Sequence, residues 1–306
     1  MTKPLISIAL CTFNGDKFLE EQLESLVNQT YKNLEIIIID DLSTDRTLQI
    51  LKGYANKFAT IRLFQNEVNL GYIQNFEKAI SLCTGEFIAL ADQDDVWELH
   101  KIDLMLKHIG KNNLLYHDSA FIDEHGKSMG KKLSDIVNFY DGDSPNAFLF
   151  FNCVSSHALL FNKRLKNYLF PFPKSNLHDV WIAYVALNTG SIAYVKECLV
   201  KYRNHSKNTT DILKQRKNTI NKREKLNKEL NWLISCKDLS IQKDPDFIFD
   251  LVELFNNRPN QPFSLRIFSL FIKHYAQLFP IYKRSFCSKL NFIIKKSLNP
   301  KNEKAS

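Results

Sequence analysis

The sequence predicts an α/β fold, in which helices flank a mostly parallel sheet and a helical extension follows at the C-terminus. The first observation is that short apolar runs alternate with stretches of helical periodicity through the first hundred residues. The second is that these runs are continuously apolar, which indicates strands buried on both faces. The third is that the chain from about residue 211 is charged and repeats its apolar side chains at helical spacing.

The N-terminal third contains alternating strands and helices. The predicted strands are residues 5–11, 34–39, 61–64 and 86–91. Leu19, Leu23 and Leu26 recur at helical spacing after the first strand, and similar stripes follow the second and third. Each helix therefore returns the chain to start the next strand in the same direction, as a parallel sheet requires.

The middle of the chain is less regular. Residues 114–121 and 158–161 are strand-like, His178 opens an apolar helix, and residues 192–195 and 198–202 look like two paired strands. Further on, five apolar residues form one helical stripe: Leu265, Phe268, Ile272, Tyr275 and Phe279. We expect one domain over residues 1–210 and a helical, basic C-terminal region over residues 211–306.

Charge and cysteine content restrict the class of protein. The net charge is +8, and the segment from Gln261 onward holds nine Lys or Arg residues against one acid, Glu303. Such a segment suits an anionic membrane surface, with a solvated helical lid as the alternative. The six cysteines form no Cys-x-x-Cys pair, which favours buried thiols in a reducing compartment. No uncharged run reaches the ~18 residues of a membrane span, so we expect a cytoplasmic protein.

Three carboxylates directly follow the fourth predicted strand: Asp92, Asp94 and Asp95. Ligands bind at the carboxyl ends of strands in open α/β sheets. Neighbouring carboxylates repel one another unless a cation neutralises them, and oxygen ligands suit Mg²⁺ or Mn²⁺. The alternative is a strand that ends in a solvated acidic turn.

The first hundred residues closely resemble the family 2 inverting glycosyltransferases, which have the GT-A fold, a Rossmann-like sheet flanked by helices. The segments that carry the resemblance are residues 6–14, 25–31, 35–45, 69–71 with Asn75, and 91–95. Two later segments, residues 178–181 and 202–208, look like those of bacterial rhamnosyltransferase-like members. The last third of the chain resembles no family that we recognise.

The resemblance implies a nucleotide site built from the first two strand ends. Asp41 would accept the imide hydrogen of uracil or thymine, unless it is only a turn or cap acid. Thr12 and Phe13 would line the same base pocket, and core packing is the alternative for Phe13. Asn69 and Gly71 match the family's turn near the nucleotide, although a turn needs no ligand.

The resemblance also implies the reacting groups. Asp92 would hold the ribose or a metal-bound water, Asp94 would bind the metal that clamps the diphosphate, and Asp95 could exchange roles with Asp94. Asp179 would be the general base that takes the acceptor's proton; a helix-capping role is the alternative. Many members carry two successive acids at this point, whereas this chain has His178 at the first of the two positions.

His205 is a candidate third metal ligand or diphosphate donor. Arg203, His205 and Lys207 alternate, so they would face the same way if a strand continues through them, and such a cluster suits the diphosphate of the nucleotide-sugar, which makes Arg203 a predicted nucleotide-sugar ligand. One departure from the family concerns residues 156 and 157: Ser156 and His157 replace the usual Gly and small residue, a difference that bears on the shape of the donor-sugar pocket.

The sequence therefore predicts a metal-dependent inverting glycosyltransferase that uses Mn²⁺ or Mg²⁺. The donor would be dTDP-rhamnose or a UDP-hexose, and the acceptor a saccharide or lipid-linked glycan of a bacterial surface polysaccharide such as lipopolysaccharide. The Gln-x-x-Arg-Trp motif of processive synthases is absent from the sequence, so we expect single-sugar addition. The alternatives are a sugar nucleotidyltransferase and a non-catalytic protein that uses its basic tail on membrane or nucleic acid; no nucleic-acid motif accompanies that tail.

Overall fold

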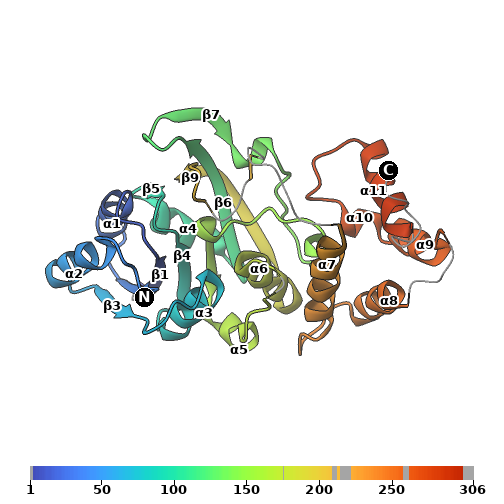
Figure 1. Ribbon diagram of the computed structural model, residues 1–306, viewed down its shortest axis with the longest axis horizontal. Coiled ribbons are helices and arrows are strands. Elements are labelled where there is room, and N and C mark those ends of the chain that lie inside the picture. The colour runs from blue at the N-terminus through green and yellow to red at the C-terminus, as the bar shows by residue number, and fades with distance from the viewer. Residues whose placement is uncertain (1–2, 175, 209–211, 214–221, 258–261, 299–306) are drawn as a thin grey trace.

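The structure is a computed structural model of the 306-residue chain. It describes residues 3–174, 176–208, 212–213, 222–257 and 262–298. Within these residues a nine-stranded sheet forms the centre of the molecule, in the order β3-β2-β1-β4-β8-β6-β9-β5, with β7 paired to β6 (Figure 1). The strands are β1 (Ile6–Thr12), β2 (Leu34–Asp40), β3 (Ile61–Gln65), β4 (Phe87–Ala91), β5 (Val96–Trp97), β6 (Leu114–Ile122), β7 (Ser128–Lys132), β8 (Leu159–Asn162) and β9 (Ile192–Arg203).

The N-terminal half of the sheet is parallel. Strands β3, β2, β1 and β4 run in one direction, and Thr12 of β1 pairs with Asp40 of β2. Their carboxyl ends therefore meet at one edge of the sheet, and the acidic residues that follow β2 and β4 are brought together there. Beyond β4, β8 is antiparallel to both its neighbours, and β6 pairs with β9 in parallel. The predicted α/β class is confirmed.

One strand prediction is wrong. Residues 192–195 and 198–202 are not two paired strands but parts of one long strand, β9, which pairs with β6. Val195 pairs with His117 and Cys198 with Asp118, so two residues of β9 bulge between these pairs. The bulge interrupts the apolar pattern at Lys196 and Glu197, which made the sequence look like a hairpin.

Helices cover both faces of the sheet (Figure 1). Apolar side chains of α1 (Leu19–Val27), α2 (Thr47–Lys57) and α4 (Lys101–Ile109) pack with Ile6, Ile8 and Leu10 of β1. Those of α3 (Tyr72–Leu82) and α6 (His178–Thr189) pack with Ala9 and Cys11 on the other side. Successive residues of β1 thus pack into the cores on opposite faces of the sheet. For this reason the strand is one unbroken apolar run in the sequence.

The described C-terminal helices follow β9, and the first of them packs against α6. They are α7 (Lys222–Lys237), α8 (Pro245–Asn256), α9 (Leu265–Lys273), α10 (Tyr275–Leu278) and α11 (Phe286–Ser297), after the short α5 (Lys166–Leu169) earlier in the chain. The Trp232 ring of α7 lies 6.1 Å from Trp181 and 5.9 Å from Tyr184. Because α6 is covered by the sheet on one side and by this layer on the other, it is apolar around its whole circumference.

Two further predictions concern this region. The predicted C-terminal helices are present, but the single stripe over residues 265–279 is wrong, because α9 ends at Lys273 and α10 begins at Tyr275. The predicted boundary at residues 210–211 lies outside the described residues. Among the described helices, none has the length and apolar content needed to cross a membrane.

Candidate active site

A cavity of about 1070 Å³ opens at the carboxyl edge of the parallel strands. Its walls come from the ends of β1, β2 and β4, the starts of α3 and α6, and the segment that follows β9. Nine of the predicted site residues line it: Thr12, Phe13, Asp41, Asn69, Gly71, Asp92, Asp94, Asp179 and His205. Residues that are far apart in the sequence are thus brought to one cavity.

Asp41 is held by the turn at residues 69–71. Its carboxylate accepts hydrogen bonds from the backbone N–H groups of Leu70 (2.8 Å) and Gly71 (2.9 Å) and from the Asn66 amide (2.7 Å). The Asn69 side chain donates to the Asp41 carbonyl. Gly71 has φ +78°, a conformation that favours glycine. The turn therefore fixes the Asp41 carboxylate. Two of the three bonds go to its Oδ1, and its Oδ2 accepts only the bond from the Gly71 N–H.

Gln93 fixes the backbone of Phe13. Its amide oxygen accepts the Phe13 N–H at 2.8 Å and its amide nitrogen donates to the Phe13 carbonyl at 3.1 Å. The Phe13 ring is 46% exposed, so the core-packing alternative for this residue is wrong. Thr12 is buried, and its hydroxyl donates to Asp40. The ring of Phe13, more than its backbone, is available to a ligand.

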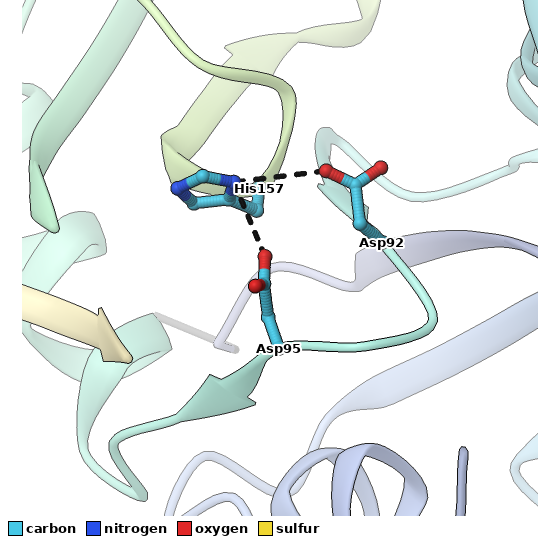
Figure 2. Close-up of side chains that lie close together, drawn as sticks. All are labelled: Asp92, Asp95 and His157. Atoms are coloured by element: carbon cyan, nitrogen blue, oxygen red, sulfur yellow. Dashed lines mark ion pairs between the residues drawn. The ribbon is translucent and has the colours of Figure 1, made fainter. Parts of the chain in front are cut away.

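Figure 2 shows His157 between two carboxylates of the acidic turn. Its Nδ1 lies 3.2 Å from Asp95 Oδ2 and 3.6 Å from Asp92 Oδ2, and its Nε2 lies 2.9 Å from the Ser119 hydroxyl. Asp95 is fully buried, and its Oδ2 has no partner with hydrogen-bond geometry among the described residues. Burial, and then the charges of Asp94 and Asp92, raise the pKa of Asp95 well above its usual range.

Two sets of residues could hold a divalent cation. The first is Asp92, Asp95 and His157, whose ligand atoms lie within 4.8 Å of one another. The second is Asp94 with His205, whose Oδ2 and Nε2 lie 2.8 Å apart on the cavity wall. Carboxylate oxygens and an imidazole nitrogen suit Mn²⁺ in either set. Asp94 and His205 both line the cavity, where a ligand's phosphates can reach them; Asp92 and His157 line it as well, but Asp95 is fully buried and is not among the described lining residues.

Arg203 supports the acidic turn from behind. Its backbone N–H donates to Asp95 Oδ1, its Nε donates to the Asp94 carbonyl, and its guanidinium pairs with Glu21. Arg203 is not among the described residues that line the cavity. Since β9 ends at Arg203, the predicted alternation of a strand through residues 203–207 is wrong. His205 and Lys207 nevertheless both line the cavity, because the loop after β9 carries them there.

Asp179 lies in the first turn of α6, on the cavity wall. The side chain is 8% exposed, and Val180 N–H donates to its Oδ1 at 2.6 Å. Burial raises the pKa of Asp179 to about 7, with the Asp92 charge as a smaller cause in the same direction. A carboxyl that titrates near neutrality can exchange protons at physiological pH.

Sequence reasoning missed three residues that organise the site. His157 was noticed only as a departure from a family pattern, although a histidine in place of a small residue is itself a signal of a specific contact. Glu21, the partner of Arg203, and Gln93, which fixes Phe13, carried no local signal. Their partners lie more than 70 residues away in the sequence, and only the folded chain brings them together.

Comparisons with known proteins agree with this geometry. The family described as Glycosyl transferase family 2 matches residues 7–171. An uncharacterised glycosyltransferase of Haemophilus influenzae is 28% identical over 242 residues, which cover 72% of each chain. Another from Methanocaldococcus jannaschii is 30% identical over 212 residues, covering 66% of this chain and 72% of that one. The Escherichia coli UDP-Glc:alpha-D-GlcNAc-diphosphoundecaprenol beta-1,3-glucosyltransferase WfgD is 25% identical over 202 residues, covering 65% of this chain and 77% of its own.

Solved structures share the fold. Staphylococcus aureus TarS residues 1–349, in complex with UDP-GlcNAc, matches with a TM-score of 0.60 and 17% identity, covering 96% of this chain and 81% of that one. The mannosyltransferase PcManGT of Pyrobaculum calidifontis, in complex with GDP-Man and Mn²⁺, matches with a TM-score of 0.55 and 13% identity, covering 97% and 80%. These likenesses confirm the predicted GT-A architecture.

Proposed function

The chain belongs to glycosyl transferase family 2 and is therefore a glycosyltransferase, and we propose that it transfers a single sugar from a nucleotide-sugar to a saccharide with inversion at the anomeric carbon. The observation that carries this proposal is one cavity with an acidic, metal-suited wall and, apart from that wall, a buried carboxyl, Asp179, whose pKa is raised by burial to about 7. The acidic wall suits a metal-bound nucleoside diphosphate, and the separate carboxyl suits a general base.

The nucleotide would lie over the ends of β1 and β2. The Asp41 carboxylate, held in place by the turn at residues 69–71, would accept the imide hydrogen of uracil or thymine. The exposed ring of Phe13 offers a surface for the base, and Thr12 borders it. This chemistry favours UDP- or dTDP-sugars, and the UDP-GlcNAc complex of TarS supports a donor of that class.

A divalent cation, Mn²⁺ or Mg²⁺, would bind at Asp94 and His205, with Asp92 nearby on the cavity wall. When bound, it would neutralise charge on the leaving nucleoside diphosphate. The Mn²⁺ in the PcManGT structure supports a cation in this fold. Asp92 would hold the ribose or a metal-bound water. Arg203 and His157 would keep the turn that carries these acids in position.

Asp179 would act as the general base. The acceptor oxygen forms a bond to the anomeric carbon, the bond from that carbon to the diphosphate oxygen breaks, and Asp179 takes the hydroxyl proton. One carboxylate is sufficient because the sugar inverts in a single displacement. The burial that raises the pKa of Asp179 supports this role, since proton transfer is most effective when the pKa lies near the working pH.

The acceptor we propose is a saccharide or lipid-linked glycan in the synthesis of a bacterial surface polysaccharide. The name of WfgD, which specifies a diphosphoundecaprenol-linked acceptor, supports this class. Residues 178–181 and 202–208 support the rhamnosyltransferase-like branch, with dTDP-rhamnose as the first donor to try.

Peripheral contact with a membrane on its cytoplasmic side would bring the enzyme to such an acceptor. Four apolar side chains of α9 and α11 are exposed: Leu265, Ile272, Phe286 and Ile294. Basic residues on the same helices, among them Arg266, Lys273 and Lys295, accompany them. Apolar side chains flanked by cations are typical of helices that bind anionic lipid surfaces.

The test of the proposed reaction is product release. The full chain is incubated with Mn²⁺, a panel of UDP- and dTDP-sugars and simple glycoside acceptors, and nucleoside diphosphate is measured. We expect release from one nucleotide-sugar to depend on both metal and acceptor, with one sugar added and the product of inverted configuration. A retained configuration would contradict the single-displacement mechanism, and no release from any donor would contradict the function.

A further inference from the structure

Among the described residues of the cavity wall, His178 is distinguished by a buried side chain whose polar atoms are unpaired. Its imidazole is only 5% exposed, yet neither ring nitrogen has a hydrogen-bond partner among the described residues. Leaving a buried polar group unpaired costs ~1–3 kcal/mol, so such groups in native proteins usually have a purpose. Because the side chain lines the cavity, a bound molecule can supply the missing partner.

Aromatic rings hold this imidazole in place. It stacks on Phe76 with centroids 4.2 Å apart and an interplanar angle of 25°, and Phe172 lies nearly parallel to it at 6.3 Å. Tyr72 borders it at 6.2 Å. The residue is also the first of α6, next to Asp179. These contacts fix the plane of the imidazole ring.

The imidazole is neutral in the folded protein. Burial lowers the pKa of His178 to about 4, since a charged ring would lose its hydration in this environment. A neutral imidazole offers one N–H donor and one nitrogen acceptor. A sugar hydroxyl likewise both donates and accepts, so the two groups match, whereas a phosphate offers only acceptors.

We propose that His178 binds a hydroxyl of a sugar in the cavity and so helps to select which saccharide is used. The inference rests on the proposed function and deepens it, because it assigns the sugar-recognition role to a residue of this chain. The exposed ring of Tyr72 provides apolar surface beside the imidazole. A site that pairs a substrate hydroxyl discriminates against sugars without it, since the imidazole would then stay unpaired.

The experiment compares two substitutions at this position. His178→Phe keeps an aromatic ring on Phe76 and removes both nitrogens, and His178→Gln keeps a donor and an acceptor. His274→Phe is the matched control: His274 also packs on a phenylalanine, Phe247, at 4.2 Å, but it is not among the described residues that line the cavity. If the larger ring prevents folding, His178→Leu serves as the second apolar variant.

Three affinities are measured with Mn²⁺ present: the Kd of UDP or dTDP alone, the Kd of the corresponding nucleotide-sugar, and the KM of a simple glycoside acceptor. One hydrogen bond is worth ~0.5–1.5 kcal/mol net, so His178→Phe should weaken either the nucleotide-sugar or the acceptor by ~2–10-fold. The free nucleotide should bind unchanged, and His178→Gln should retain more of the sugar affinity. Weakening of the nucleotide-sugar assigns the contact to the donor sugar; a raised acceptor KM assigns it to the acceptor.

The inference is overturned if the apolar variant folds and neither sugar affinity changes, if nucleotide affinity falls to the same extent, or if His274→Phe has the same effect. Failure of the proposed function looks different, because the unmodified chain would then release no nucleoside diphosphate from any donor. Thermal unfolding adds a further check: removing unpaired nitrogens should leave His178→Phe at least as stable as the parent chain.

Discussion

Asp179→Asn should inactivate the enzyme and stabilise its fold. Burial raises the pKa of Asp179 from 3.8 to about 7, and one pKa unit corresponds to ~1.4 kcal/mol. The folded protein therefore holds this proton more tightly than the unfolded chain does. That contribution favours folding below pH 4 and is lost as pH rises to 7, so at pH 8 the ionised carboxyl destabilises the fold by on the order of 4 kcal/mol. Asparagine has the same shape and no such charge.

Urea unfolding of both proteins at pH 5.5 and pH 8 measures the effect. The stability advantage of Asp179→Asn should grow by about 2 kcal/mol between the two, because only the part of the titration above pH 5.5 contributes. Comparing the two pH values cancels any effect of the amide that does not depend on pH. An advantage that stays constant from pH 5.5 to pH 8 would refute the assignment of a buried carboxyl that titrates near 7.

The same variant tests catalysis. Loss of a general base typically costs ~10²–10⁴-fold in rate, while the Kd of the nucleotide-sugar should change little. In the parent enzyme kcat/KM should rise with pH toward a plateau above about pH 7, since the base must be ionised. Asp123→Asn is the matched control, because that carboxylate is exposed in the β6–β7 turn and accepts bonds from its own loop. If Asp179→Asn loses no more of its catalytic rate than Asp123→Asn does, the base is elsewhere.

Three further outcomes are expected. Asp94→Ala should abolish Mn²⁺-dependent turnover with an unchanged circular dichroism spectrum; retained activity that still requires Mn²⁺ would argue against the metal assignment. His157→Ala should lower thermal stability by ~1–3 kcal/mol, since it removes the imidazole that lies 3.2 Å from buried Asp95 and contacts the Ser119 hydroxyl, and an unchanged Tm would contradict that role. Leu265→Ser with Phe286→Ser should reduce sedimentation with anionic liposomes at low salt while sparing turnover of a soluble acceptor; sedimentation equal to that of the parent chain would contradict the membrane contact.

Most of the N-terminal fold follows from the sequence, because each strand there is a continuous apolar run and each helix has an apolar stripe. The strands β1, β2, β3 and β4 lie within a residue or two of their predicted positions. The prediction fails at β9, where a bulge against β6 interrupts the pattern. Pairing between strands about 80 residues apart decides that geometry, and local periodicity carries no information about it.

The sequence predicted which residues lie at the cavity where a family motif names them, as for Asp41, Asp94 and Asp179, and their roles stay predictions. Arg203 shows the limit of such reasoning. Its sequence position suggested a phosphate ligand, but in the fold its guanidinium lies 4.7 Å over the Phe18 ring and pairs with Glu21. A motif predicts which residues are near one another; which way each side chain points depends on neighbours that the motif does not contain.

The stability cost and the proposed chemistry of Asp179 have one physical cause. Helix α6 is buried along its length, and Trp232 of α7 packs on Trp181 and Tyr184 near its start. Burial there leaves His178 neutral and raises the pKa of Asp179 toward 7. The layer of C-terminal helices would thus act on catalysis without contributing a residue to the cavity. Variants that loosen its contact with α6, such as Trp232→Ala, should lower the pKa of Asp179 toward its ordinary value and shift the rise of kcat/KM to lower pH; an unshifted profile in a folded, active variant would contradict this coupling.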